Sequence, residues 1–335
     1  MTEQTQLAWD IIETTNTNLF LTGKAGTGKT TFLRRLKEES SKRIVVVAPT
    51  GIAAINAEGV TIHSFFQLSF APFIPNYNLK EQQFRFSKQK INVIRSIDTL
   101  VIDEISMVRA DLLDAVDSVL RRFRKNNLPF GGVQMVMIGD LGQLAPVAKD
   151  DEWQMLSRYY ATPYFFSSLA LQRTRYAIVE LTKVYRQSDK RFLDILNKVR
   201  ENRADAAVLS ALNSRYIPGF KPRKEDGYIR LTTHNWQAQR INDHELELLP
   251  GKPYTYTATI EGKYPEMLFP TDETLTLKTG AQVMFVKNDS SADKAYYNGM
   301  IGTIAAIDAE GFTVTAKDTG ENIRVQPCLL YTSDA

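Results

Sequence analysis

Continuous apolar runs alternate with amphipathic segments along the first half of the chain. The runs of Val, Ile, Leu and Met that are long enough for buried strands cover residues 18–22, 43–49, 99–104 and 134–140. Between them, apolar residues recur at helical spacing. This spacing predicts a first helix that begins after an N-cap at Thr2, helices over 29–40 and 51–59, a helix that ends at Arg95, and a helix over 109–125. Apolar strands separated by helices are typical of a parallel sheet covered on both faces.

The pattern changes after about residue 166. Helices over 188–200, 204–213 and 236–248 and a strand over 227–233 predict a second, smaller α/β unit. From residue 254 onward the runs are short, alternate apolar with polar positions and are punctuated by Gly and Asp. This pattern predicts a small β-barrel that is appended to the second unit or inserted in it.

A glycine-rich turn follows the first predicted strand. Residues 23–30, Gly-Lys-Ala-Gly-Thr-Gly-Lys-Thr, satisfy the pattern G-x-x-x-x-G-K-[ST] between a strand and a helix. Such a loop wraps phosphates with its backbone N–H groups at a helix N-terminus; Lys29 would reach the β- and γ-phosphates, and the Thr30 hydroxyl would bind Mg²⁺. The alternative, a Gly-rich turn that arose by chance, is disfavoured by the flanking elements. The predicted loop contacts are Gly23, Ala25, Gly26, Thr27, Gly28, Lys29, Thr30 and Thr31.

Acidic and amide side chains follow two later strands. The strand over 99–104 ends in Asp103 and Glu104, where Asp103 would hold Mg²⁺ and Glu104 would activate the attacking water. The strand over 134–140 is followed by Asp140 and Gln143, which could sense the γ-phosphate. Because no Asn-Lys-x-Asp guanine-reading motif is present, ATP is favoured over GTP as the nucleotide that is hydrolysed.

Composition narrows the picture only slightly. Forty-one Lys and Arg against 38 Asp and Glu give a net charge of +3, a weak argument for a polyanion partner. Basic clusters at 121–127 and 219–230 could contact a phosphate backbone, although such runs are more often solvated faces. One cysteine, Cys328, and three histidines exclude a disulfide framework and a cysteine-rich zinc site, so we expect any metal to be held by oxygens. The polar N-terminus and the absence of a membrane-length apolar run lead us to expect a cytoplasmic protein.

Five motifs in order resemble the superfamily 1B DNA helicases of the petite-integration-frequency (PIF) type, which are relatives of RecD. The matching segments are "GKAGTGKT" as motif I, "APTGIAA" as Ia, "VIDEISMV" as II, "GDLGQLAPV" as III and "LTKVYRQSD" as IV. The resemblance implies an ATP-dependent helicase that moves 5′ to 3′ on single-stranded DNA. Its relatives unwind duplexes, forks and often G-quadruplexes, in repair, recombination or replication.

The resemblance also assigns roles to single residues. Gln4 is placed like the adenine-reading Gln of the family, Gln143 like its γ-phosphate sensor and Arg186 like an arginine finger from the second RecA-like domain. It implies tandem RecA-like domains, with domain 1A over 1–165, the first part of domain 2A over 166–265, an SH3-like insert over 266–328 and a non-native tail over 329–335. We expect ATP and Mg²⁺ as cofactors, and a monomer that acts on single-stranded, forked or structured DNA without contacting a membrane.

A DNA track is predicted with less support than the ATP site. A single strand bound without sequence preference needs a basic groove with aromatic or polar platforms. The candidates follow predicted strands, but Phe66 and Trp236 could equally be core residues and His234 could cap a turn. They are Thr50, His63, Phe66, His234, Asn235 and Trp236.

Two other functions stay open at this point. The chain could be a P-loop ATPase that remodels something other than nucleic acid, or a single-strand DNA-binding module with a vestigial ATP site; the intact Lys29, Thr30, Asp103 and Glu104 count against the second. The family's motifs V and VI are absent from the printed sequence, which ends in "CLLYTSDA". We therefore expect a fragment that binds ATP, hydrolyses it weakly in response to DNA and does not unwind duplexes.

Overall fold

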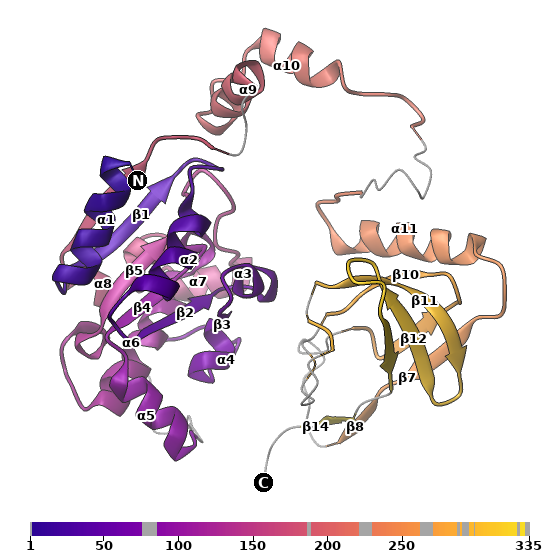
Figure 1. The fold of residues 1–335 in the computed structure, drawn as a ribbon, viewed down its shortest axis with the longest axis horizontal. Helices are drawn as coiled ribbons and strands as arrows, with labels where there is room; N and C mark the ends of the chain where they lie inside the picture. Colours follow the sequence, from indigo (N-terminus) through magenta and orange to yellow (C-terminus); the bar gives the residue numbers. More distant parts are fainter. Residues whose placement is uncertain are drawn as a thin grey trace. The chain divides into compact units, whose positions relative to one another are not determined.

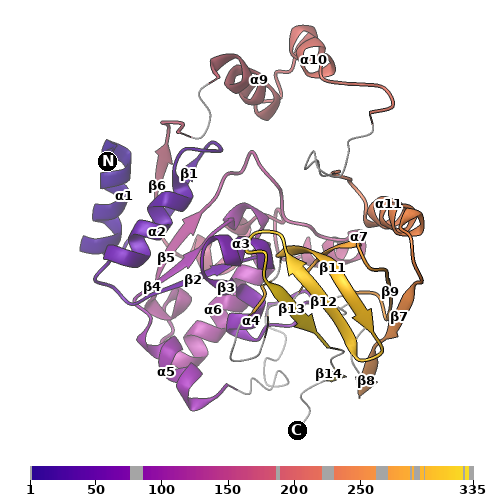
Figure 2. The same ribbon diagram turned by 45° about the vertical axis from the view of Figure 1, so that its right-hand side comes forward.

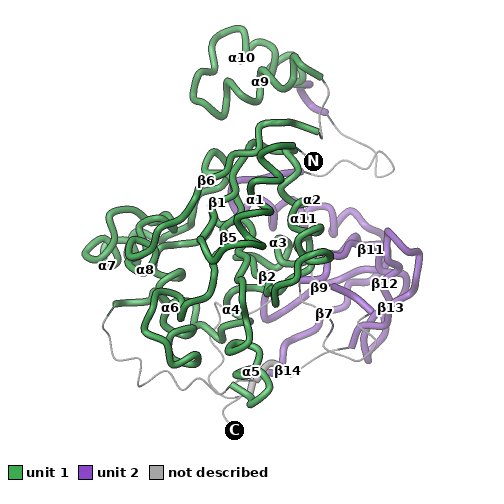
Figure 3. The backbone as a smooth tube through the Cα atoms, turned by 60° about the vertical axis from the view of Figure 1, so that its left-hand side comes forward, with its two compact units in different colours: residues 1–216 green, residues 217–335 purple. Residues whose placement is uncertain are grey.

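The computed structural model describes residues 2–75, 86–185, 189–220, 230–261, 271–286, 289, 295–297, 299–326 and 329–331. The chain divides into two compact units, residues 1–216 and 217–335 (Figure 3).

Six parallel strands form the centre of the first unit (Figures 1 and 2). They lie in the order β3-β2-β4-β5-β1-β6. Because β4, β5 and β1 are neighbours and run in the same direction, the loops that follow them meet at one edge of the sheet. The strands are β1 (Asn18–Gly23), β2 (Ile44–Ala48), β3 (Val60–Thr61), β4 (Thr99–Ile102), β5 (Gln134–Ile138) and β6 (Tyr176–Leu181).

Helices connect these strands. The first begins after Thr2, whose hydroxyl oxygen accepts a hydrogen bond from the backbone N–H of Thr5 at 3.2 Å, which confirms the predicted N-cap. The helices of the first unit are α1 (Glu3–Thr14), α2 (Lys29–Glu39), α3 (Gly51–Asn56), α4 (Ile62–Phe66), α5 (Lys88–Ser96), α6 (Ala110–Arg124), α7 (Asp150–Leu156), α8 (Leu169–Gln172), α9 (Lys190–Arg200) and α10 (Ala206–Asn213). Short 3₁₀ turns lie at η1 (Ile105–Met107), η2 (Pro129–Gly132) and η3 (Phe165–Ser167).

The two faces of this sheet carry separate hydrophobic clusters, because side chains alternate along each strand. Leu100 and Ile102 of β4 point into a cluster with α4, α5, α6 and α8. Val101, between them, points into the opposite cluster with α1 and α2. Strands that are buried on both sides need apolar residues at every position, which explains the continuous runs in the sequence.

A buried carboxylate of α6, that of Asp114, attaches the segment before β6 to the core. Asp114 accepts four hydrogen bonds, from the hydroxyls of Tyr160 (2.9 Å) and Ser168 (2.5 Å) and from the backbone N–H groups of Leu169 and Ala170 (both 3.0 Å). A carboxylate this well satisfied compensates for its loss of hydration and fixes the segment before β6.

The second unit is mainly antiparallel. Strands β10 (Gln282–Met284), β11 (Ile301–Asp308), β12 (Gly311–Ala316) and β13 (Asn322–Val325) form one sheet in sequence order. Helix α11 (Asn235–Leu248) and the residue after it contribute Leu246 and Leu249 to a small core with Leu277 and Ile304. The remaining strands pair as β7 (Tyr254–Thr257) with β9 (Thr274–Leu277), antiparallel, and β8 (Thr259–Glu261) with β14 (Leu329–Tyr331), parallel.

The first unit extends further than the boundary predicted at residue 165. Strand β6 adds to the first sheet beside β1, with Leu19 opposite Ala177, and α9 and α10 belong to the same compact unit. The strand predicted over 227–233 lies partly outside the described residues, and its described part, residues 230–233, is not a strand. The parallel α/β sheet itself and the small β structure near the end of the chain are confirmed.

Candidate nucleotide site

The predicted phosphate loop connects the end of β1 to the start of α2. Gly23, Gly26 and Gly28 have φ values of +149°, +78° and +92°, a backbone region that residues with a Cβ rarely adopt. Gly28 is the left-handed N-cap of α2, and no side chain of the described residues caps this helix. The first N–H groups of α2 therefore face the loop, as an anion site at a helix N-terminus requires.

Lys29 lies in the first turn of α2 and is partly buried. Its ammonium donates hydrogen bonds to the carbonyl oxygens of Gly23 (2.6 Å) and Lys24 (3.2 Å). Burial and, to a smaller extent, the charge of Arg200 lower the pKa of Lys29, while the charges of Asp140, Glu104 and Asp103 act in the opposite direction. Three carboxylates from the ends of two neighbouring strands thus lie within electrostatic range of this ammonium.

Asp103 and Glu104 follow β4 at the same edge of the sheet. Asp103 donates its backbone N–H to the carbonyl of Val47 in β2 at 2.9 Å. Burial raises its pKa to about 6; the Glu104 backbone N–H and the Lys29 charge oppose this rise, and the charge of Glu104 adds to it. Glu104 has a left-handed backbone, with φ of +50°, which is uncommon for a residue other than glycine and frequent at functional sites.

Asp140 and Gln143 follow β5, between β4 and β1. Asp140 is buried, with 1% of its surface exposed. Its carboxylate accepts hydrogen bonds from the Gly142 backbone N–H (3.0 Å) and from the Gln143 side-chain amide (3.1 Å). The sequence predicted both residues near the γ-phosphate, and the charge of Asp140 raises the pKa of Lys29 in the phosphate loop.

A later segment of the first unit also contacts the phosphate loop. The backbone N–H of Tyr185 donates to the carbonyl of Gly26 at 2.8 Å, and the Tyr185 ring lies 3.7 Å from where a Cβ of Gly28 would be. Lys24 pairs with Glu201 at 3.2 Å. The sequence reasoning missed Tyr185 and Glu201, because nothing in a linear pattern indicates contacts over about 160 residues or more.

The other predicted ATP-site residues are distributed as follows. Gln4 lies in the first turn of α1, and Thr30 and Thr31 lie in the first turn of α2, where both are exposed. Ala25 is also exposed, and Thr27 is buried with its hydroxyl donating to the carbonyl of Lys24 at 2.9 Å. Arg186 lies outside the described residues.

One of the predicted DNA contacts is wrong on physical grounds. Phe66 is fully buried in the core on the α4 side of the sheet, so its ring cannot stack on a base. Thr50 is exposed but caps α3, accepting from the backbone N–H of Ala53 at 3.2 Å. The His63 ring stacks on Phe70 with centroids 4.4 Å apart, and burial, with the nearby Arg109 charge, lowers its pKa against the opposing effect of Asp111.

The second unit carries the remaining predicted DNA contacts. Trp236 is 58% exposed, which disfavours the core alternative, and the Arg240 guanidinium lies 5.5 Å from its ring centroid. His234 precedes α11, and its Nδ1 is 2.9 Å from the Thr233 hydroxyl. Asn235 is the first residue of α11.

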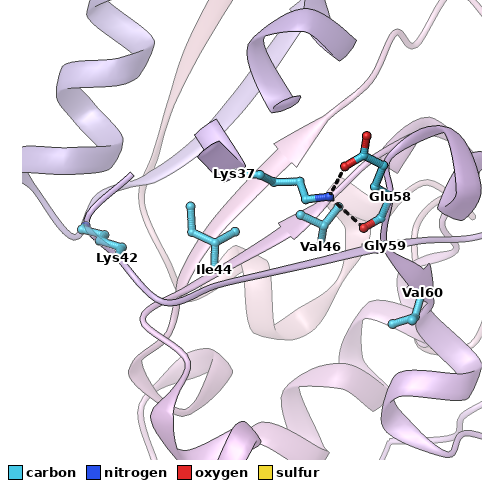
Figure 4. A pocket seen from close by; sticks show the side chains of 7 residues that line it. All are labelled: Lys37, Lys42, Ile44, Val46, Glu58, Gly59 and Val60. Atoms are coloured by element: carbon cyan, nitrogen blue, oxygen red, sulfur yellow. Dashed lines mark hydrogen bonds and ion pairs between the residues drawn. The ribbon is translucent and has the colours of Figure 1, made fainter. Parts of the chain in front are cut away.

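A pocket of about 430 Å³ lies elsewhere, near the start of β2 and of β3 (Figure 4). Its two ammonium groups already have acceptors: Lys37 donates to Glu58 at 2.9 Å, and Lys42 donates to the carbonyl of Thr15 at 2.6 Å. The phosphate loop follows the opposite, carboxyl end of β1, so this pocket is not the nucleotide site.

The donor groups of the site fit a magnesium nucleotide. A protein usually gives Mg²⁺ only a hydroxyl and one or two carboxylates, and the substrate phosphates and water supply the other ligands. Among the described residues there is no group of three or more His, Cys, Asp or Glu that could hold a metal alone. In the same part of the chain, no helix combines the length and apolar character needed to cross a bilayer.

A parallel sheet with a glycine-rich loop between β1 and α2, and acidic residues after the next strands, defines a P-loop NTPase of the RecA-like fold. Residues 2–208 match the family of PIF1-like helicases, and the chain belongs to this family. This confirms the resemblance inferred from the motifs.

Individual relatives agree with this assignment. An ATP-dependent DNA helicase Pif1 from Psychrobacter is 37% identical over 315 residues, which cover 89% of this chain and 45% of that protein. A structure of two coordinating Pif1 helicases at forked double-stranded DNA superposes with a TM-score of 0.85 at 42% identity, over 97% of this chain and 76% of that one. The structure of the Bacteroides Pif1 helicase in complex with ADP-AlF₃ and single-stranded DNA superposes with a TM-score of 0.84 at 39% identity, over 97% of this chain and 74% of that one. The chain thus spans less than half the length of the curated relative.

Proposed function

We propose that the chain is the ATP-hydrolysing part of a DNA helicase that translocates 5′ to 3′ along single-stranded DNA. The observation that carries the proposal is the convergence of Lys29, Asp103 and Glu104 at the carboxyl edge of β1 and β4, in a member of the PIF1-like helicase family. These are the parts that nucleotide hydrolysis needs: a cation for the phosphates, a ligand for the metal and a base.

Each group has a distinct role in this proposal. The loop N–H groups and Lys29 bind the phosphates, and Thr30 and Asp103 would hold Mg²⁺, which when bound neutralises phosphate charge. Glu104 accepts a proton from the attacking water. Gln4 reads the adenine, and Gln143 and Arg186 contact the γ-phosphate. Burial leaves the Lys29 ammonium poorly solvated and lowers its pKa, and a phosphate would compensate this loss of hydration better than the neutral loop carbonyls do.

DNA is the proposed partner because relatives have been crystallised with it: the Bacteroides Pif1 helicase binds single-stranded DNA. In this chain Trp236, with Arg240 beside its exposed ring, is the strongest stacking platform among the predicted contacts. Thr50, His63, His234 and Asn235 stay predictions. We also propose a cytoplasmic location, a monomer as the active form, and an SH3-like insert over 266–328.

Two assays test this proposal. ATP turnover is measured with and without a single-stranded oligonucleotide; a helicase is stimulated, a remodelling ATPase is not, and a vestigial site shows no turnover. Translocation is then compared on single strands that carry a bound protein block at the 5′ or the 3′ end, because we do not expect this chain to unwind duplexes. Turnover that ignores DNA would refute the nucleic-acid function, and displacement of only the 5′ block would refute the polarity.

A further inference from the structure

The buried carboxylate of Asp140 has a partner that the ATP-site motifs do not include. Arg200, the last residue of α9, donates from Nη2 to Oδ1 of Asp140 at 2.5 Å and from Nε to Oδ2 at 3.4 Å. Asp140 is 1% exposed, whereas the Arg200 side chain is 28% exposed. Burial alone would raise the pKa of Asp140, but the hydrogen bonds from Arg200, Gln143 and Gly142 lower it overall.

Both oxygens of this carboxylate connect Arg200 to the loop after β5. Oδ1 also accepts from the Gly142 backbone N–H, and Oδ2 also accepts from the Gln143 side-chain amide. Gln143 is itself exposed, so its orientation depends on this hydrogen bond and on the one from its backbone N–H to the Asp140 carbonyl at 3.0 Å. If Arg200 moves, the carboxylate that holds the Gln143 amide loses its charge partner.

The loop is shaped to admit the guanidinium. A Cβ on Gly142 would lie 2.6 Å from Nε and 2.9 Å from Cγ of Arg200, distances that real Cβ atoms essentially never show. Gly142 does not have a positive φ, so the absence of a side chain there is explained by the close approach of Arg200 and not by the backbone.

The neighbouring residue of the same helix end contacts the phosphate loop. Glu201 pairs with Lys24, which lies within that loop, at 3.2 Å. The C-terminal end of α9 therefore contacts two loops of the nucleotide site, after β1 and after β5. A contact of this kind transmits a displacement of α9 to both loops, or a change at the nucleotide to α9.

We propose that Arg200 is a positioning residue for ATP hydrolysis, which through Asp140 holds the Gln143 amide in its working orientation and couples α9 to the nucleotide site. This inference rests on the proposed function, because Gln143 matters only if the site hydrolyses ATP. It differs from the role of an arginine finger, since the guanidinium of Arg200 is bound to Asp140, the carboxylate that also accepts from the Gln143 amide.

The experiment is a double-mutant cycle on DNA-stimulated ATP turnover. We expect Arg200→Ala to lower kcat by about tenfold or more, as loss of a charge-assisted hydrogen bond in a working geometry does, with a smaller change in KM. Arg200→Lys keeps the charge but loses the planar fork, so it should recover only part of the rate. The variant Arg200→Ala/Gln143→Ala should be no slower than Gln143→Ala, because both changes interrupt one connection.

Two further variants separate positioning from folding. Gly142→Ala retains both charged groups and displaces the guanidinium, so it should lower kcat in the same direction with little change in the melting temperature. Arg191→Ala removes an exposed arginine from the same helix and should leave kcat unchanged.

The outcomes are distinct. Two results would refute the positioning role and leave the proposed function standing, provided that the wild-type rate responds to DNA. In the first, Arg200→Ala hydrolyses ATP as fast as the wild type. In the second, Arg200→Ala slows the Gln143→Ala variant by the same factor by which it slows the wild type. A wild-type rate that does not respond to DNA refutes the proposed function, and this inference with it.

Discussion

Gly28→Ala tests the phosphate loop with a magnitude that follows from its backbone. Gly28 has φ of +92° and ψ of +14°, and its added Cβ would meet nothing closer than the Tyr185 ring at 3.7 Å. Space is therefore available, and the cost of alanine is conformational. For a residue with a Cβ, the left-handed region costs roughly 1–2 kcal/mol.

The loop can avoid this cost by rotating the peptide, but it must then return to the left-handed geometry to direct its N–H groups at a phosphate. The strain therefore makes the free energy of ATP binding less favourable by the same amount. A loss of about 1–2 kcal/mol corresponds to roughly 5- to 30-fold weaker binding.

The assay is titration of the protein with a fluorescent ATP analogue in Mg²⁺. Gly320→Ala is the matched control, because Gly320 has φ of +72° and nothing within 4 Å of its added Cβ, but it lies in the second unit. Gly28→Ala should lose affinity with little loss of stability, whereas Gly320→Ala should lose some stability and no affinity. Equal dissociation constants for Gly28→Ala and the wild type would refute the claim that this backbone geometry forms the phosphate site.

Four other changes have defined outcomes. Glu104→Gln should retain ATP binding and slow turnover by about 10²–10⁴, as loss of a general base does; an unchanged turnover rate would remove this role. Lys29→Ala should abolish turnover and leave single-strand DNA affinity intact in a filter-binding assay, and a parallel loss of both would show that the two sites are not separate. Asp114→Ala leaves four donors without their acceptor, three of them buried, so the free energy of unfolding in urea should fall by about 3–5 kcal/mol, and a fall below about 1 kcal/mol would contradict the described network. The Arg43 hydrogen bond holds the pKa of Asp98 at about 2, below its usual 3.8, so this pair stabilises the fold above pH 4 and loses its effect as the pH falls towards 2. Because the pair is exposed and screened by solvent, the loss of stability should be small. It should disappear in Arg43→Ala, and an equal acid sensitivity in that variant would assign the effect to another group.

The sequence predicted the first sheet and the phosphate loop because both depend on local patterns. A short apolar run rich in Val and Ile, with turn residues at its ends, indicates a buried strand, and the left-handed N-cap next to Lys29 favours glycine. The sequence also predicted that Asp103 and Glu104 lie near Lys29, since parallel strands bring their carboxyl ends to one edge, and the charges of both do act on Lys29.

Contacts between distant segments could not be predicted in this way. Arg200 is 60 residues from Asp140, and nothing in the spacing of α9 distinguishes it from the exposed Arg191 of the same helix. Phe66 illustrates the converse error: an aromatic residue after a short strand has the same sequence pattern whether its ring is exposed to DNA or, as here, buried in the core. Residues 176–181 were placed in the second domain and were not predicted to be a strand, because the pairing of β6 with β1 is not a local property.

ATP hydrolysis by the 335-residue chain, followed as phosphate release with and without a single-stranded oligonucleotide, tests the central claim most directly. The account predicts a Mg²⁺-dependent rate that rises when the oligonucleotide is added and that disappears in Lys29→Ala. A rate that is the same with and without DNA, or one that persists in Lys29→Ala, would contradict it.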